Sequence, residues 1–214
     1  RMMPVTREGR PDRLLARPPD PSAVFYNLRS LCLTDRPEDE RTERGNDAWK
    51  QKLNNVRSLT HKYDVVCISE IHWSAAEAWQ YFFRHLRNTF VFVFQEGGMA
   101  ILVNADWARE AGIAQPEGDN NGANFFVVIP GVAHALRFGT GQGTGWIISF
   151  RLDAKSPTTR IGQLRAMTTW MGLHGKQATV IFGGDRNFTE SAWERNASTG
   201  TPAPCSDKMR RAWL

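Results

Sequence analysis

The sequence predicts a mixed α/β or α+β domain in which helices cover a two-layered or sandwiched sheet. Short apolar runs rich in Val, Ile and Phe alternate with stretches of helical periodicity. Some of these runs follow one another after a tight turn, as in a hairpin, whereas others are separated by a helix. A purely parallel sheet would lack the hairpins. At 214 residues with 41% hydrophobic content, the chain is long enough for one full core, so one domain is the default.

Residues 1–21 are predicted to be a flexible arm. They carry five prolines among several arginines and no hydrophobic signal segment. Such a composition cannot bury enough apolar surface to fold, so residues 22–214 are predicted to form the domain. Because the first residue is Arg rather than Met, we expect the sequence to be a fragment of a longer chain.

The first half of the domain is predicted to hold four strands and two helices. Asp47 and Ser74 are favoured N-cap residues and precede the two helical patterns. A Gly97-Gly98 pair supplies the tight turn between the last two strands. In chain order, the predicted elements are a strand at 23–28, a helix from Asp47, a strand at 64–69, a helix at 75–86 and strands at 90–94 and 99–104.

The second half is predicted to hold three further strands, a long helix and a last strand. The glycine-rich segment 139–145 is predicted to be a hairpin loop, because a β-like run follows it and not a helix N-terminus that could bind phosphate. The predicted elements are strands at 125–129, 133–138 and 146–152, a helix at 158–174 and a strand at 178–182.

Charge and cysteine content narrow the classes of partner and compartment. A net charge of +5 favours an anionic partner such as nucleic acid or a phosphorylated small molecule, although a solvated basic surface gives the same value. Three well-separated cysteines favour neither a zinc site nor a disulfide framework, so a nuclear or cytoplasmic location is expected rather than secretion. No apolar run approaches the roughly 18 to 20 residues of a membrane span. Nothing in the sequence specifies an oligomeric state.

Polar side chains follow several predicted strands at the point where each strand ends. The strand at 178–182 runs into two glycines and then Asp185 and Asn187, which we expect to lie on one side of an extended backbone. Asn27 and Glu70 also follow β-like runs, and α/β proteins assemble sites at strand ends. The four side chains would offer oxygen atoms to a hard cation or a water molecule.

These residues also have local explanations. An Asp-x-Asn after two glycines is common in turns, and Glu70 suits a solvated position near a helix N-terminus. His72 lies two residues after Glu70 and is a further candidate, although most single histidines are ordinary surface residues.

Four motifs in order resemble the endonuclease/exonuclease/phosphatase (DNase I-like) superfamily. The resemblance spans about residues 24–188 and looks closest to retroelement or uncharacterised endonuclease-like domains. It implies a four-layered α/β sandwich that uses Mg²⁺, with Mn²⁺ as a substitute, to cleave phosphate esters. The motifs are Phe25-Tyr-Asn-Leu-Arg-Ser30, Asp64-Val-Val-Cys-Ile-Ser-Glu70, Gly97-Gly-Met-Ala-Ile-Leu-Val103 and Gly183-Gly-Asp-Arg-Asn-Phe188.

The resemblance also implies roles for the strand-end residues. Glu70 would be the metal carboxylate and Asn27 a metal-site amide. Asp185 would orient or deprotonate the attacking water, and Asn187 would contact the phosphate. Arg151 stands where the family often has a Tyr and is an additional candidate for the site.

Other features depart from the family pattern. Arg186 replaces the aromatic residue usual between Asp185 and Asn187. The family's Ser-Asp-His near the C-terminus is not found, and its nearest counterpart, at residues 206–208, is Ser-Asp-Lys. We therefore expect the final strands of the sandwich to be missing from this chain.

The expected function is a Mg²⁺-dependent, endonuclease-like phosphodiester hydrolase acting on nucleic acid, with DNA favoured over RNA. Two alternatives stay open at this stage. One is a catalytically inactive, truncated relative that serves as a binding module or is a retroelement remnant. The other is a phosphatase of a phosphorylated lipid or sugar.

Overall fold

The computed structural model describes residues 20–28, 43–71, 74–94, 98–117, 121–139, 143–176 and 178–186, with the backbone alone for 43–49. Among these residues, no helix is both long enough and apolar enough to cross a membrane.

Eight strands and four helices make up the described part of the chain. They are β1 (Ala23–Asn27), α1 (Glu43–Lys62), β2 (Val65–Ser69), α2 (Ala75–His85), β3 (Thr89–Val93), β4 (Ala100–Asn104), α3 (Ala105–Glu110), β5 (Phe125–Ile129), β6 (Ala133–Phe138), β7 (Gly145–Arg151), α4 (Pro157–His174) and β8 (Thr179–Asp185).

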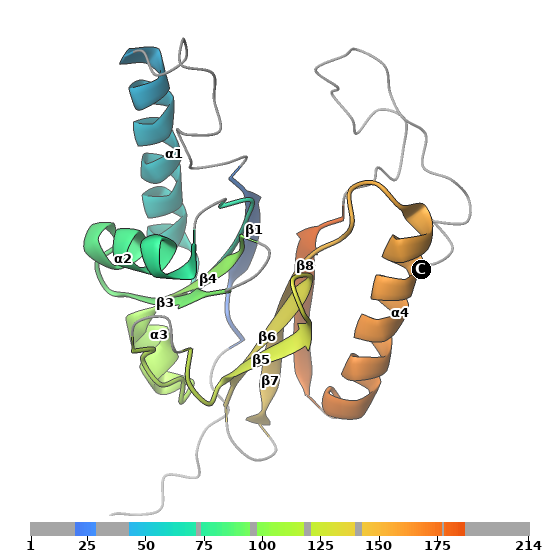
Figure 1. Ribbon diagram of the computed structural model, residues 1–214. Helices are drawn as coiled ribbons and strands as arrows, with labels where there is room; N and C mark the ends of the chain where they lie inside the picture. The colour runs from blue at the N-terminus through green and yellow to red at the C-terminus, as the bar shows by residue number, and fades with distance from the viewer. Residues whose placement is uncertain are drawn as a thin grey trace, which may run out of the picture.

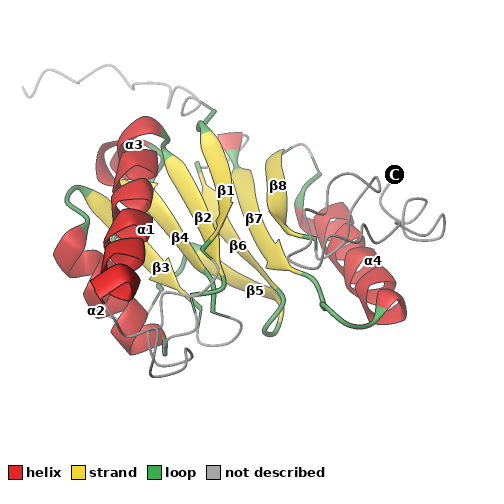
Figure 2. Ribbon diagram, turned by 90° about the horizontal axis from the view of Figure 1, so that it is seen from above, coloured by secondary structure: helices red, strands yellow, loops and turns green. Residues whose placement is uncertain are grey.

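Two four-stranded sheets pack face to face. Their strand orders are β1-β2-β4-β3 and β5-β6-β7-β8. Strands β1 and β2 are parallel, as are β7 and β8, and the other neighbours are antiparallel. Helices α1 and α2 cover the outer face of the first sheet and α4 that of the second, as Figures 1 and 2 show. The predicted four-layered α/β sandwich, with its mixture of hairpins and crossovers, is confirmed.

The alternation of side chains along each strand separates the cores of the sandwich. In β2, Val65 and Cys67 face the core between the two sheets, whereas Val66 and Ile68 face the core under α1 and α2. Helix α3 adds Trp107 to the core between the sheets. Because both faces of β2 are buried, the strand is apolar at its first four positions and lacks the polar alternation of a surface strand; only its last residue, Ser69, is polar.

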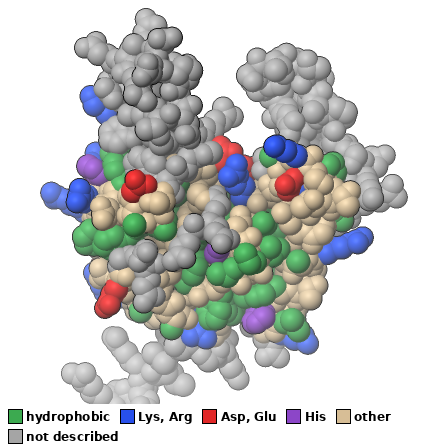
Figure 3. Space-filling view, in the orientation of Figure 1, with side chains coloured by type: hydrophobic (Ala, Val, Ile, Leu, Met, Phe, Trp, Pro, Cys, Tyr) green, Lys and Arg blue, Asp and Glu red, His purple; other side chains and the backbone are tan. Residues whose placement is uncertain are grey.

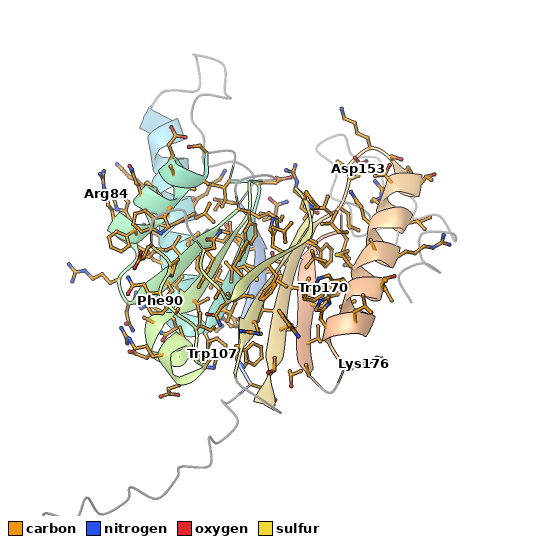
Figure 4. All side chains as sticks on the ribbon, turned by 60° about the horizontal axis from the view of Figure 1, so that its bottom comes forward. Arg84, Phe90, Trp107, Asp153, Trp170 and Lys176 are labelled. Atoms are coloured by element: carbon orange, nitrogen blue, oxygen red, sulfur yellow. The ribbon has the colours of Figure 1, made fainter. Side chains whose placement is uncertain are left out.

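Helix α4 covers the second sheet through aromatic side chains. Trp170 points from the helix toward the sheet (Figure 4), and its ring lies 5.0 Å from that of Trp146 in an edge-to-face arrangement. The indole Nε1 of Trp146 donates to the carbonyl oxygen of His174 at 3.0 Å, so this buried ring satisfies its polar atom. The helix begins with Ser156 as its N-cap.

Two element boundaries differ from the prediction by three residues or more, and one helix was not predicted. Helix α1 begins at Glu43, so Asp47 lies inside its first turns and is not the N-cap. Helix α3, which was not predicted, is capped by Asn104, whose side-chain oxygen accepts from two backbone N–H groups of the first turn. Strand β8 does not stop before its glycines but continues to Asp185, because it pairs with β7 along its whole length. The predicted cap of α2, Ser74, is confirmed and forms a full capping box.

Candidate functional site

The carboxyl ends of β1, β2, β7 and β8 meet at one end of the sandwich. Strands β1 and β2 run in parallel, and so do β7 and β8, so each pair ends together. The ends of β1 and β8 lie at the upper end of the molecule in Figure 1. Acidic and basic side chains lie side by side at this end in Figure 3, where the two halves of the sandwich meet. The fold therefore brings strand ends that are far apart in sequence to a single place.

The core between the sheets changes from apolar to polar toward this end. Successive inward-facing positions of β1, β2, β7 and β8 form layers, because the register of both parallel pairs advances two residues at a time. The first layer is wholly apolar, the second is mixed and the third is wholly polar. The layers are Ala23, Val65, Ile147 and Ile181, then Phe25, Cys67, Ser149 and Gly183, and then Asn27, Ser69, Arg151 and Asp185.

Gly183 sets how closely the two sheets approach. A Cβ atom at this position would lie 2.4 Å from a carbon of the Phe25 ring, far inside van der Waals contact. The ring of Phe25 therefore packs directly on the backbone of β8. Two residues further along both strands, the same approach brings Asn27 to Asp185, and the amide Nδ2 donates to the carboxylate Oδ2 at 3.0 Å. The sequence Gly-Gly-Asp thus sets both the spacing and the polar contact of the site.

Gly184 supplies a second special backbone position beside Asp185. Its φ of 157° is one that other residues rarely adopt, and a Cβ atom there would lie 1.9 Å from the carbonyl oxygen of Phe150. Strand β8 can pair with β7 through this point only because the residue is glycine. The pairing ends with the backbone N–H of Leu152 donating to the carbonyl oxygen of Asp185 at 2.9 Å, which holds the backbone of this acidic residue.

Glu70 follows directly after β2 in a left-handed conformation. Its φ is 60°, which costs an L-residue other than Gly, Asn or Asp about 1–2 kcal/mol. The neighbouring backbone is held, because Ile71 N–H donates to the carbonyl oxygen of Gly98 at 2.8 Å. Such strain in a residue with fixed neighbours is a feature of functional sites.

The Glu70 carboxylate faces Arg151 across the two sheets. Oε1 of Glu70 lies 3.5 Å from Nη2 of Arg151, and their side chains are 21% and 30% exposed. Arg151 is also the register partner of Asp185. Contacts therefore connect all four strands in a ring: β1 to β2 and β7 to β8 by pairing, β1 to β8 through Asn27, and β2 to β7 through this ion pair.

Two titratable groups lie in the core between the sheets. Burial raises the pKa of the Cys67 thiol to about 12, and a hydrogen bond with Ser149 only partly opposes this. His134 stacks on Phe94, with ring centroids 4.0 Å apart, and burial lowers its pKa to about 4. The Nδ1 atom of His134 has no hydrogen-bond partner within the described residues. Both groups are therefore neutral at pH 7.

The structure brings together four of the six residues that the sequence suggested. Asn27, Glu70, Arg151 and Asp185 form the ring of contacts described above. The other two, Asn187 and His72, lie outside the described residues. Sequence reasoning missed Ser69, which the register places beside Asn27 in the polar layer. The period-2 alternation from Cys67 could have indicated it, because positions 67 and 69 share a face.

The donor atoms suit a hard divalent cation better than zinc. The described residues hold no group of three or more His, Cys, Asp or Glu side chains that could bind a metal ion, as a zinc site would require. Mg²⁺ instead keeps several waters and takes one or two carboxylates together with substrate phosphate. Glu70, directly after β2, and Asp185, at the end of β8, are two carboxylates that could take that role.

Comparisons with known proteins agree with this arrangement. The model of the endonuclease/exonuclease/phosphatase family matches residues 24–206, a range that includes all four residues of the ring. No curated protein matches the sequence significantly.

Solved structures with the same fold differ widely in sequence. A functionally unknown conserved protein from Enterococcus faecalis is 17% identical, with a TM-score of 0.55 over 79% of this chain and 68% of its own. A humanised variant of TDP2 from D. rerio is 16% identical, with a TM-score of 0.52 over 78% and 63%. A mannosyl-6-phosphatase from Bacteroides thetaiotaomicron is 13% identical, with a TM-score of 0.51 over 84% and 68%. The chain thus spans about two thirds of these structures.

Proposed function

Because this chain belongs to the endonuclease/exonuclease/phosphatase family, we propose that it is a Mg²⁺-dependent phosphodiester hydrolase acting on nucleic acid, with DNA as the preferred substrate. The observation that carries the proposal is the convergence of Glu70 with the hydrogen-bonded Asn27 and Asp185 at the ends of β1, β2 and β8. The net charge of +5 supports a polyanionic substrate.

Each side chain of the site has a role in this proposal. The Asn27 amide donates to Asp185 and so holds its carboxylate in one orientation. Asp185 then accepts the proton of a water molecule, which attacks phosphorus and expels the ester oxygen. Glu70 would hold the cation, which when bound would supply positive charge to the phosphate oxygens. One water is consumed, and the cleaved diester yields a phosphate monoester and a hydroxyl group.

The test is nicking of supercoiled plasmid DNA in the presence and absence of Mg²⁺. We expect Asp185→Asn to lower the rate by about 100-fold or more, as for removal of a general base. The matched control is Asp106→Asn, the same chemical change in α3, which lies at the opposite end of the sandwich (Figure 1). Nicking that persists in Asp185→Asn, or that needs no divalent cation, would contradict the assigned role.

A second candidate is the hydrolysis of a small phosphate monoester, such as a phosphorylated sugar or lipid. It is favoured by the shared fold with a mannosyl-6-phosphatase. Release of inorganic phosphate from a sugar phosphate, with no cleavage of DNA or RNA under the same conditions, would favour this candidate. A folded protein that cleaves neither substrate would instead be a binding module, the remaining alternative.

A further inference from the structure

Arg151 reaches from one sheet to the Glu70 carboxylate on the other. The distance of 3.5 Å between Nη2 and Oε1 is longer than the roughly 2.7–2.9 Å of a close charge-assisted hydrogen bond. Both side chains keep part of their surface in solvent, at 30% and 21%. The contact is therefore a loose ion pair between partly exposed groups, weaker than a close charge-assisted hydrogen bond.

The register places Arg151 next to a second acidic residue. Arg151 and Asp185 are direct partners in the parallel pairing of β7 and β8. Arg151 is thus joined to Glu70 of the other sheet by the ion pair and lies next to Asp185 of its own sheet by strand register.

We infer that Arg151 is an internal counterion of Glu70 that a divalent cation must displace, so that this arginine weakens metal binding at the site. The inference rests on the proposed function, in which Glu70 holds the cation. It predicts that Arg151 and the cation compete for one carboxylate and that the ion pair opens when the metal binds. Arg151 acts through Glu70 and is a positioning residue.

Charge gives the direction and the size of the effect. Removing one positive charge a few ångströms from a divalent ion at a partly exposed site raises the affinity for that ion about tenfold. A merely structural role for Arg151 predicts the opposite, because a loosened site would bind metal more weakly. Metal affinity therefore separates the two explanations without any measurement of catalysis.

The experiment measures Mn²⁺ binding to the full chain by the electron paramagnetic resonance signal of the unbound ion. We expect Arg151→Gln and Arg151→Met to bind Mn²⁺ about tenfold more tightly than the unsubstituted protein. We expect Arg151→Lys to stay near the original affinity, because it keeps the charge. The matched control is Arg109→Gln, which breaks an arginine–carboxylate pair of 2.7 Å in α3 and should leave Mn²⁺ affinity unchanged.

The variant Glu70→Gln identifies Mn²⁺ binding at the site, because only that binding should be lost when the carboxylate is removed. Suppose that Mn²⁺ binding depends on Glu70, but folded Arg151→Gln and Arg151→Met bind the ion no more tightly than the unsubstituted protein. That result would overturn the inference and leave the proposed function standing. If neither the unsubstituted protein nor any Arg151 variant binds Mn²⁺ in a way that depends on Glu70, the inference about Arg151 and the proposed metal site are both wrong. Binding that appears only after Arg151 is replaced would support the inference in its strongest form.

Discussion

Replacing Glu70 by Gly is expected to leave a more stable protein than replacing it by Ala. Glu70 has a φ of 60°, a left-handed conformation that costs a residue with a Cβ atom about 1–2 kcal/mol. Alanine keeps that cost and glycine removes it. The greater freedom of glycine in the unfolded chain offsets about 0.5–1 kcal/mol of the gain. Both variants lose the ion pair with Arg151, so this loss cancels, and the difference in free energy of unfolding is about 1 kcal/mol in favour of glycine.

Urea and thermal denaturation of the two variants measure this difference. For a chain of this length, 1 kcal/mol corresponds to a difference of about 2–4 °C in melting temperature. The control is the same pair of substitutions at Glu110, the last residue of α3. There the backbone is helical, and glycine should be less stable than alanine by up to about 1 kcal/mol. An equal or lower stability of Glu70→Gly relative to Glu70→Ala would show that the left-handed conformation stores no strain, and the reasoning would be wrong.

Three further predictions concern the core and the glycines of the site. Because burial lowers the pKa of His134 from 6.5 to about 4, the unfolded chain binds this proton more tightly, and stability should fall by up to roughly 3 kcal/mol as the pH drops from about 6.5 to 4. In His134→Phe, the free energy of unfolding measured by urea denaturation should change less with pH over this range. Gly184→Ala should destabilise the protein by more than about 1 kcal/mol because of its backbone clash, whereas Gly162→Ala, which has open space on α4, should stabilise it by up to about 1 kcal/mol, as measured by melting temperature. Cys67 should react with a thiol reagent at pH 8 only after denaturant unfolds the chain, because its thiol is buried and has a pKa of about 12.

Local sequence signals predicted most of the elements but not all of their ends. Ser74 was recognisable as a cap, because a capping box needs only residues three positions apart. The continuation of β8 through two glycines to Asp185 was not recognisable. It depends on pairing with β7, and a glycine in a strand pattern ordinarily indicates an interruption. Helix α3, with six residues, was too short to show a helical period.

The site followed the same division between local and tertiary information. The positions of Asn27, Glu70 and Asp185 after apolar runs predicted that each would lie at a strand end, and the structure places them there. No local sequence pattern could predict which of these residues are in contact. Residues 27 and 185 are 158 positions apart, and their hydrogen bond exists because the Phe25 ring packs on Gly183.

The sequence alone determined the mixed α/β class, the order of most strands and helices, and the family to which the ordered motifs belong. Periodicity and capping act over a few residues, and a motif is preserved as a string, so both can be identified without a structure. Only the tertiary structure decided that Arg151 pairs with Glu70 and that Glu70 adopts a left-handed conformation. These features arise from the packing of two sheets and from their register, which depend on contacts between segments distant in the chain.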